Sequence, residues 1–434
     1  MTRFEPAAAG PDLYERIRRL YPICRSITGD GVRETLRLIA EEIELEVREI
    51  PSGTPVFDWT VPNEWNIRDA YIADARGERV VDFRASNLHV VNYSVPVHGH
   101  MSLAQLRPHL FSIPEQPDWI PYRTAYYAET WGFCLSHRQL EQLEDQTYEV
   151  HIDSSLAPGH LTFGQSYLAG ETADEVLFSS HVCHPSLCND NLSGISVAVS
   201  LAKILRDRPR RYSYRFVFAP GTIGAITWLA LHQPQAERVA HGVILACAGD
   251  RGPLTYKRSR RGGAAIDRAF AHLLKDRPGA QLQEFSPLGY DERQYCSPGF
   301  NLPVGVLSRT PHGCFPEYHT SADDLDLVAP EALADTLSLL LELVDVIEGD
   351  ATFRNLNPRC EPQLGRRGLY AAMGGHTGQD RRLREAALLW VLNLSDGGHS
   401  LLDVAERSGL PFGTVRDAAA SLEAAGLLER MRSA

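Results

Sequence analysis

Three side chains that could bind a metal ion stand close together in the segment SSHVCHPSLCNDNLSG. His181, His184 and Asp190 offer two imidazoles and a carboxylate, which are ligands that a catalytic zinc ion accepts. His184 precedes Pro185, so its alternative role is only to shape the loop. A second segment, PEYHTSADDLDLV, places His319 before a threonine and an acidic run. The two segments together predict a metal centre.

The elements around the first segment would place it at the edge of a sheet. Residues 175–180 form a short apolar run typical of a buried strand, and residues 195–206 show a helical pattern. Loops that leave the carboxyl ends of strands carry the chemistry of open α/β sheets. We therefore expect His181 and Asp190 to project from such a loop.

Strand-like runs alternate with helical patterns along most of the chain. Strands are expected at 46–50, 148–152, 159–168, 175–180, 214–219 and 242–247, and helices at 12–20, 31–45, 195–206, 225–232, 263–274 and 330–347. This alternation predicts an α/β fold in which a mixed, mainly parallel sheet has helices on both faces.

Pattern and composition divide the chain into several parts. Residues 54–126 hold prolines, tryptophans and short alternating segments, which predict a small inserted β-domain. Residues 1–53 and 127–350 would form the main α/β domain around it. Residues 351–382 are rich in Pro, Gly and Arg, as expected of a linker. The helix, turn, helix and strand patterns within 383–434 resemble a winged helix-turn-helix.

The order of these motifs resembles the co-catalytic zinc aminopeptidase and carboxypeptidase family, to which leucyl aminopeptidases and glutaminyl cyclases are related. In that family one His opens a loop, an Asp before x-x-Ser-Gly bridges two zinc ions, and a later His-Thr-x-x-Asp supplies another ligand. His181, Asp190 in DNLSG and His319 stand at these positions. Asp250 in ILACAGDRG matches a further Asp ligand at a strand end. The phrases VFDWTVPNEWNI, RTAYYAETWGFCL, SPLGYDERQYCSPGF and FPEYHTSAD are similar to an aminopeptidase-like subgroup with an inserted β-domain and a C-terminal winged helix.

The sequence departs from that family at two places. Where the peptidases have Glu-Glu-x-Gly, which supplies the general base and a zinc ligand, this chain has Gly221 and Thr222. The family's His-x-Asp reads His-Val-Cys at 181–183, so a partner that steadies the His ligand is also changed. One zinc ion per chain would still polarise a carbonyl and lower the pKa of its water to about 7. The resemblance thus implies a mononuclear site with the ligands His181, Asp190, Asp250 and His319.

A replacement for the missing base must come from another carboxylate within reach of the reacting water. Glu317 lies two residues before His319, and Asp291 and Glu292 begin the loop DERQYCSPG. In the peptidases the equivalent loop approaches the metal and shapes the substrate pocket. All three carboxylates are candidates. We predict Glu317 and Glu292 as catalytic residues and Asp291 as a substrate-binding residue.

Two further regions are predicted to contact the substrate. The insert could form a lid over the metal loop, with Arg123 or Tyr126 reaching into the site, because binding sites favour domain junctions. The tryptophans of this region could equally serve packing alone. Arg258 in YKRSRRG could pair with a substrate carboxylate, or it could belong to a solvated turn.

Composition restricts the class of protein. With 44% hydrophobic and 23% charged residues, the 434-residue chain resembles soluble globular proteins. No signal peptide or membrane span is evident, and the eight cysteines lack the spacing of a disulfide framework, so we expect a cytoplasmic location. The net charge of −12 argues against nucleic acid or acidic membranes as partners. Because TVRDAAASLEAA has one arginine against two acidic residues, we predict that the winged helix packs or dimerises in a homo-oligomer.

The leading hypothesis is a zinc-dependent hydrolase that cleaves an amide bond of a small peptide or amino-acid conjugate, with a biosynthetic intermediate as one possible substrate. Glutaminyl cyclases suggest a variant in which the same fold carries out a cyclisation. The residues Gly221 and Thr222 suggest a second class, a binding or scaffold protein without catalysis. The helix-turn-helix pattern suggests a third, a metabolite-sensing regulator that binds DNA.

Overall fold

The structure, a computed structural model, describes residues 6–370 and 379–431. The chain forms two compact units. The first holds the residues up to 267 together with 278–338, and the second holds 268–277 together with the residues from 339 onward. Part of the predicted linker, residues 371–378, lies outside the described residues.

A mixed sheet of eight strands forms the centre of the first unit. In spatial order the strands are β1 (Glu46–Pro51), β10 (His160–Leu168), β12 (Ser213–Ala219), β11 (Glu175–His181), β13 (Val239–Leu245), β16 (Val304–Ser308), β14 (Thr255–Lys257) and β15 (Gln281–Gln283). The four neighbours β12, β11, β13 and β16 run parallel, and antiparallel pairs join them to β10 and β14. Every residue of β11 and β12 is buried, as expected for strands covered on both faces. The predicted fold class is confirmed.

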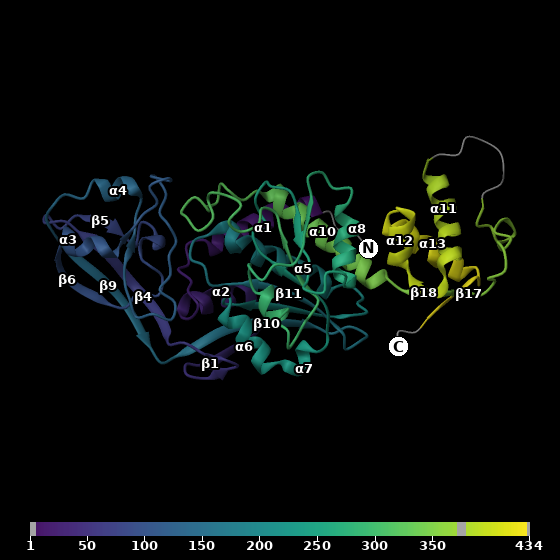
Figure 1. The fold of residues 1–434 in the computed structure, drawn as a ribbon, viewed down its shortest axis with the longest axis horizontal. Coiled ribbons are helices and arrows are strands. Elements are labelled where there is room, and N and C mark those ends of the chain that lie inside the picture. Colours follow the sequence, from purple (N-terminus) through teal and green to yellow (C-terminus); the bar gives the residue numbers. More distant parts are fainter. Residues whose placement is uncertain (1–5, 371–378, 432–434) are drawn as a thin grey trace. The chain divides into compact units, whose positions relative to one another are not determined.

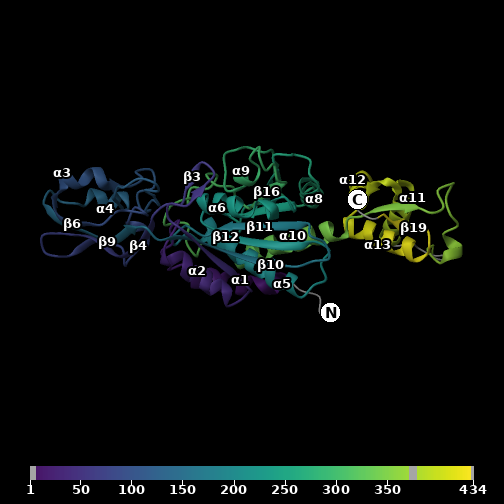
Figure 2. The same cartoon turned by 90° about the horizontal axis from the view of Figure 1, so that it is seen from below.

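Helices cover both faces of this sheet (Figure 2). On one side lie α1 (Pro6–Leu20), α2 (Asp30–Ala40) and α5 (Gly194–Arg206), and on the other lie α6 (Ile223–Leu231) and α9 (Glu292–Tyr295). Two helices, α8 (Ala265–Leu274) and α10 (Pro330–Gly349), contribute residues to both units. Because α5 begins directly after the turn that follows β11, the predicted strand, loop and helix are present in that order.

The inserted domain contains a four-stranded antiparallel sheet of β5 (Arg79–Asp82), β4 (Glu64–Ala73), β9 (Thr147–Ala157) and β6 (Val97–Ser102). Strands β4 and β9 lie side by side (Figure 1). The structure corrects one prediction here, because residues 148–152 were expected in the main domain but pair with β4 and β6 as part of β9. The alternating sequence predicted a strand correctly, but alternation alone does not identify the neighbouring strands.

The second unit carries the predicted winged helix-turn-helix. It contains β17 (Thr352–Asn355), α11 (Gln379–Leu394), β18 (Asp396–Ser400), α12 (Leu401–Ser408), α13 (Phe412–Ala424) and β19 (Leu428–Arg430). Gly409 ends α12 with φ 72°, a left-handed conformation that glycine adopts readily. The central strand of its three-stranded sheet, β17, comes from the segment predicted as linker. A strand of four residues is too short to stand out from Pro- and Gly-rich surroundings.

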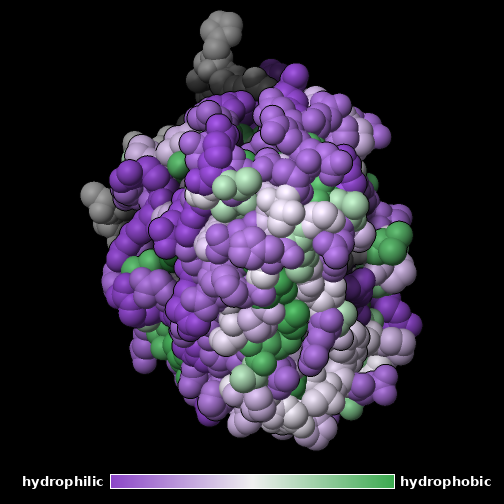
Figure 3. All heavy atoms as spheres, turned by 90° about the vertical axis from the view of Figure 1, so that its left-hand side faces the viewer, coloured by the Kyte–Doolittle hydropathy of each residue, from purple (hydrophilic) through white to green (hydrophobic). Residues whose placement is uncertain are grey.

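Hydrophilic residues cover most of the face drawn in Figure 3, with hydrophobic residues gathered in a strip between them. Among the described residues, no helix combines the length and the apolar character needed to cross a bilayer.

Candidate metal centre

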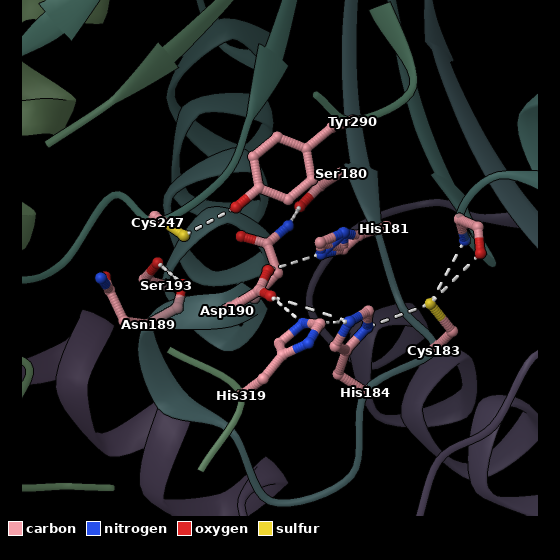
Figure 4. A network of polar contacts seen from close by, with 12 residues as sticks. Ser180, His181, Cys183, His184, Asn189, Asp190, Ser193, Cys247, Tyr290 and His319 are labelled. Atoms are coloured by element: carbon pink, nitrogen blue, oxygen red, sulfur yellow. Dashed lines mark hydrogen bonds and ion pairs between the residues drawn. The ribbon is translucent and has the colours of Figure 1, made fainter. Parts of the chain in front are cut away.

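Four side chains from two separate segments meet at the carboxyl end of β11 (Figure 4). His181 is the last residue of β11, and His184 follows it in the loop. Asp190 lies in the turn that leads into α5, and His319 comes from the loop between β16 and α10. The burial of β11 and α5 fixes the two ends of the first segment, so the loop between them holds its side chains in place.

Asp190 is the centre of this cluster. Its Oδ1 lies 2.9 Å from His181 Nε2, and its Oδ2 lies 3.0 Å from His319 Nε2 and 3.7 Å from His184 Nε2. The Nε2 atoms of His184 and His319 are 3.2 Å apart. The Asp190 side chain is fully buried, whereas 34% of the His319 side chain is exposed, so the cluster opens toward solvent on the His319 side.

The residues present fit a bound metal ion. Ligand atoms of His181, His184 and Asp190 all lie within 4.8 Å of one another. His181 Nε2 and Asp190 Oδ1 are close enough for an ion pair, yet neither atom has a hydrogen-bond partner of acceptable geometry. Buried polar atoms of this kind need a partner. A cation shared by the two atoms would satisfy both.

The protonation states also suit metal binding. Burial lowers the pKa of His181, and it lowers the pKa of His184 well below the usual 6.5. Burial alone would raise the pKa of Asp190, but His184, His319 and His181 together hold it well below its usual value. At neutral pH His181 and His184 therefore present neutral imidazoles and Asp190 an ionised carboxylate, which are the forms that bind metals.

Neighbouring groups hold the ligands in position. The carboxylate of Asp323 accepts hydrogen bonds from the backbone N–H groups of Asn189, at 2.5 Å, and of Asp190, at 2.9 Å. Cys183 Sγ lies 3.2 Å from His184 Nδ1 and accepts the backbone N–H of Gly221 at 3.3 Å. The thiol thus lies beside His184 rather than His181, and side chains next to metal ligands tune metal affinity.

Tyrosine rings form the walls of the site. The ring of Tyr122 lies 5.1 Å from both His184 and His319. The ring of Tyr290 lies 5.3 Å from His181, and Tyr318 stacks on His319 at 3.9 Å. Aromatic walls exclude water and strengthen electrostatic interactions inside the site.

Comparison with known proteins places this geometry in a family. A family model described as "Domain of unknown function (DUF4910)" matches residues 14–350, and a winged helix-turn-helix model matches 351–430. The chain belongs to the DUF4910 family. A curated relative from Clostridium acetobutylicum, named provisionally as a polysaccharide biosynthesis protein with an aminopeptidase-like domain, is 49% identical over 97% of this chain and 96% of its own length.

Solved structures show the fold that this DUF4910 protein shares. A crystal structure from C. acetobutylicum, described provisionally as a peptidase, matches with a TM-score of 0.94 and 47% identity over 98% of both chains. A zinc aminopeptidase from Bacillus subtilis matches with a TM-score of 0.56 and 12% identity over 78% of this chain and 95% of that one. A peptidase M28 precursor from Shewanella amazonensis matches with a TM-score of 0.52 and 13% identity, over 79% of this chain and 95% of that one. The resemblance to zinc aminopeptidases is thereby confirmed at the level of the fold.

The structure places the expected ligands of the DUF4910 protein in two separate hydrogen-bond networks. It brings His181, Asp190 and His319 together, but Asp250 takes part in a different network. The carboxylate of Asp250 accepts hydrogen bonds from Asn189 Nδ2 at 2.9 Å, from Gly252 N at 2.7 Å and from Thr310 Oγ1 at 2.6 Å. From the sequence, His184 could be either a metal ligand or a residue that only shapes the loop. In the structure it lies within the cluster.

The two predicted catalytic carboxylates do not meet the cluster directly. Glu292 is buried and forms an ion pair with Lys257 Nζ. The lysine stabilises the ionised carboxylate and so makes Glu292 a weaker base. Among the described residues, no hydrogen bond or ion pair joins the Glu317 side chain to the cluster, and its backbone carbonyl accepts the Thr320 N–H at 3.0 Å. Asp291, predicted to bind substrate, is buried, and its Oδ1 has no hydrogen-bond partner.

The other predicted substrate contacts are also placed elsewhere. Arg258 Nη1 donates to the Gly262 carbonyl at 2.8 Å, and its Nε lies 3.2 Å from a Glu284 carboxylate oxygen. The Arg123 guanidinium lies over the Phe111 ring at 4.2 Å. The Tyr126 hydroxyl lies 2.9 Å from that of Tyr122, so Tyr126 reaches the site through this neighbour. Tyr122, not singled out in the sequence, brings the inserted region into contact with the histidine cluster.

We expect Asp291 to make the metal-free protein less stable as pH rises. Burial, followed by the charge of Glu292, raises the pKa of Asp291 to about 8. An unfolded Asp has a pKa of about 3.9, so the folded state holds this proton over a wider pH range. The stabilisation is fully present below about pH 4 and is lost as pH rises through about 8, by up to ~1.4 kcal/mol per pH unit.

Thermal unfolding of chelator-treated protein would measure this effect. Between about pH 5 and pH 8, the melting temperature of the wild type should fall more steeply than that of Asp291→Asn, which carries no titrating group. Asp326→Asn, which changes an exposed carboxylate, should follow the wild-type curve. Parallel curves for the wild type and Asp291→Asn would contradict the assigned pKa.

Proposed function

We propose that this DUF4910 protein is a zinc-dependent hydrolase that cleaves an amide bond of a small peptide or amino-acid conjugate with one zinc ion. The observation that carries the proposal is the convergence of three histidines on the buried carboxylate of Asp190. His181, His184, Asp190 and His319 would hold the ion. A zinc ion in such a site acts as a Lewis acid toward a carbonyl and lowers the pKa of a water molecule to about 7.

The protein's own residues would select and orient the substrate. Tyr122, Tyr290 and Tyr318 surround the histidines, so an apolar group of modest size fits beside the metal better than a charged one. The inserted region supports one wall, because the Tyr122 N–H donates to the His319 carbonyl at 2.7 Å. This hydrogen bond ties the insert to the loop that carries a ligand, which favours a closed site over an extended groove.

The name of the curated relative supports a substrate from a biosynthetic pathway rather than a protein digest. With the cysteines of the described residues all free, the proposal includes a cytoplasmic location. We also propose a homo-oligomer in which the winged helix packs or dimerises rather than binding nucleic acid.

Gly221 and Thr222 stand where the related peptidases have two glutamates. This difference favours one competing function, a binding protein that keeps the fold without catalysis. Zinc content by elemental analysis and cleavage of aminoacyl p-nitroanilides and N-acyl amino acids, followed by mass spectrometry, would decide between them. We expect about one zinc per chain and cleavage that chelation abolishes. One zinc without cleavage would favour the binding protein, and no zinc uptake would refute the hydrolase.

A further inference from the structure

A buried arginine reaches the metal loop from the N-terminal part of the first unit. Arg25 lies between α1 and α2, and only 1% of the residue is exposed. Its Nε donates to the carbonyl oxygen of His184 at 2.7 Å, and its Nη1 donates to the carbonyl oxygen of Leu20 at 2.8 Å. The guanidinium therefore joins the end of α1 to the loop that carries a histidine of the cluster.

Burial makes this arrangement costly for the fold. The acceptors of the guanidinium, which include Thr35 Oγ1 at 3.3 Å, are neutral oxygens, and Nη2 is buried without a hydrogen-bond partner. Arginine stays charged at neutral pH, and a buried charge without an opposite charge destabilises the folded state. Apolar side chains at buried charged positions are often equally stable or more stable. The bond to His184 is the contact that gives this arginine a use beyond packing.

The backbone of the metal loop needs an anchor at this point. Pro185 follows His184 and has no N–H group, so the loop cannot donate a backbone hydrogen bond there. Proline also restricts the residue before it to extended conformations. The carbonyl of His184 remains as a backbone group by which the loop can be held, and Arg25 donates to it.

The imidazole of His184 is held separately from its backbone. Cys183 Sγ lies 3.2 Å from Nδ1, and the ring stacks on that of His181 with the centroids 4.7 Å apart (Figure 4). Its Nε2 lies 3.7 Å from Asp190 Oδ2. These contacts fix the rotation of the ring, whereas the bond from Arg25 fixes the position of the backbone that carries it.

Arg25 is itself held by the inserted region. Asn92 Nδ2 donates to the Arg25 carbonyl at 2.8 Å, and Asn92 Oδ1 accepts the Ser26 hydroxyl at 2.5 Å. The backbone N–H of Asn92 donates to the Arg123 carbonyl at 2.8 Å, one residue after Tyr122. One buried residue of the insert thus fixes both Arg25 and the segment that carries a tyrosine wall of the site.

We infer that Arg25 is a positioning residue of the proposed zinc site, which holds the His184 backbone so that the imidazole meets the ion together with Asp190. This inference rests on the proposed function. Arg25 touches neither substrate nor metal and acts through His184. Its removal should therefore change the affinity and the geometry of the metal site without removing a ligand.

Titration of the full-length, metal-free protein with zinc and with cobalt(II) tests the inference. The visible absorption of bound cobalt(II) depends on the number and geometry of its ligands, so it reports a displaced imidazole. We expect Arg25→Met to weaken zinc binding by about 10- to 100-fold, as loss of a partner of a metal ligand does, and to change the cobalt spectrum. Arg25→Lys keeps a charge and a donor but loses the rigid fork, so it should recover part of the affinity.

Arg16→Met is the matched control. Arg16 is also a buried arginine, with 8% exposed, but its Nη1 donates to the Ser196 carbonyl of α5 at 3.0 Å rather than to the metal loop. This variant should unfold at a lower temperature and keep the zinc affinity and cobalt spectrum of the wild type. Equal losses of affinity in Arg16→Met and Arg25→Met would indicate general destabilisation and would overturn the inference.

Arg25→Lys decides the matter if the metal-free melting curve shows that Arg25→Met does not fold. A zinc affinity below that of the wild type, at an equal melting temperature, would support the inference. Wild-type affinity with an unchanged cobalt spectrum would overturn it, as would wild-type affinity in a folded Arg25→Met. A wild-type protein that binds neither zinc nor cobalt(II) would refute the proposed function, and the inference with it.

Discussion

Replacing Asp190 with alanine should abolish zinc binding. The Asp190 carboxylate contacts all three histidines of the cluster, at 2.9, 3.0 and 3.7 Å, and its side chain is fully buried. Loss of an outer partner of a ligand already weakens metal binding by about 10- to 100-fold, so loss of a central ligand should cost more than about 100-fold. Isothermal titration of the metal-free protein with zinc would measure the change.

The same substitution should remove the stabilisation that zinc provides. A ligand at 1,000 times its dissociation constant stabilises the folded state by about 4 kcal/mol, and this gain should vanish in Asp190→Ala. Thermal unfolding with and without zinc gives the comparison. Both measurements refer to the same folded chain, so a variant that fails to fold would be recognised by its metal-free melting curve.

Asp250→Asn is the matched control for this prediction. Asn keeps a carbonyl oxygen that can accept from Thr310 and Gly252, and the structure gives Asp250 no contact with the histidines among the described residues. We therefore expect Asp250→Asn to retain one zinc. If it lost zinc as completely as Asp190→Ala, the ligand set implied by the family resemblance would be right and the arrangement around His184 would be wrong.

The sequence predicts the position of Asp190 well, because a clear strand pattern precedes it and a clear helix pattern follows it. The apolar run of β11 and the helical pattern of α5 are both continuous, so the turn between them could be placed at the edge of the sheet. His184 was harder to assign. The proline after it indicated a loop role, whereas its spacing of three residues from His181 was the signal that could have identified a second imidazole of the same site.

Long-range contacts explain what the sequence could not show. Asp250 follows the end of β13 by five residues, and Thr310, sixty positions further along the chain, donates hydrogen bonds to its carboxylate. Tyr122 and Tyr126 stand four residues apart in one tyrosine-rich segment. Only the pairing of Tyr122 with His319 decides which ring meets the cluster. Neither the Asp250–Thr310 contact nor the Tyr122–His319 contact can be predicted from the residues near each of them in the sequence.

The other end of β11 carries a prediction about stability. Glu175 is the first residue of β11 and forms a bidentate ion pair with Arg215 on β12, at 2.6 Å for Nε to Oε2 and 2.9 Å for Nη2 to Oε1. Both side chains are buried, with 1% and 8% exposed. Arg215 also donates to Gln165 Oε1 at 3.0 Å. The pair joins the two central strands at the end opposite to His181.

Glu175→Gln should destabilise the first unit by about 3–5 kcal/mol, because it leaves a buried guanidinium without its anion. Urea unfolding, followed by tryptophan fluorescence, would give the difference in the free energy of unfolding. The double variant Glu175→Gln, Arg215→Met should recover much of the loss, since the uncompensated charge is gone. Zinc binding should persist in both variants under conditions where they are folded. A single variant within about 1 kcal/mol of the wild type would mean that Gln165 alone compensates the arginine, and that water reaches this end of the sheet.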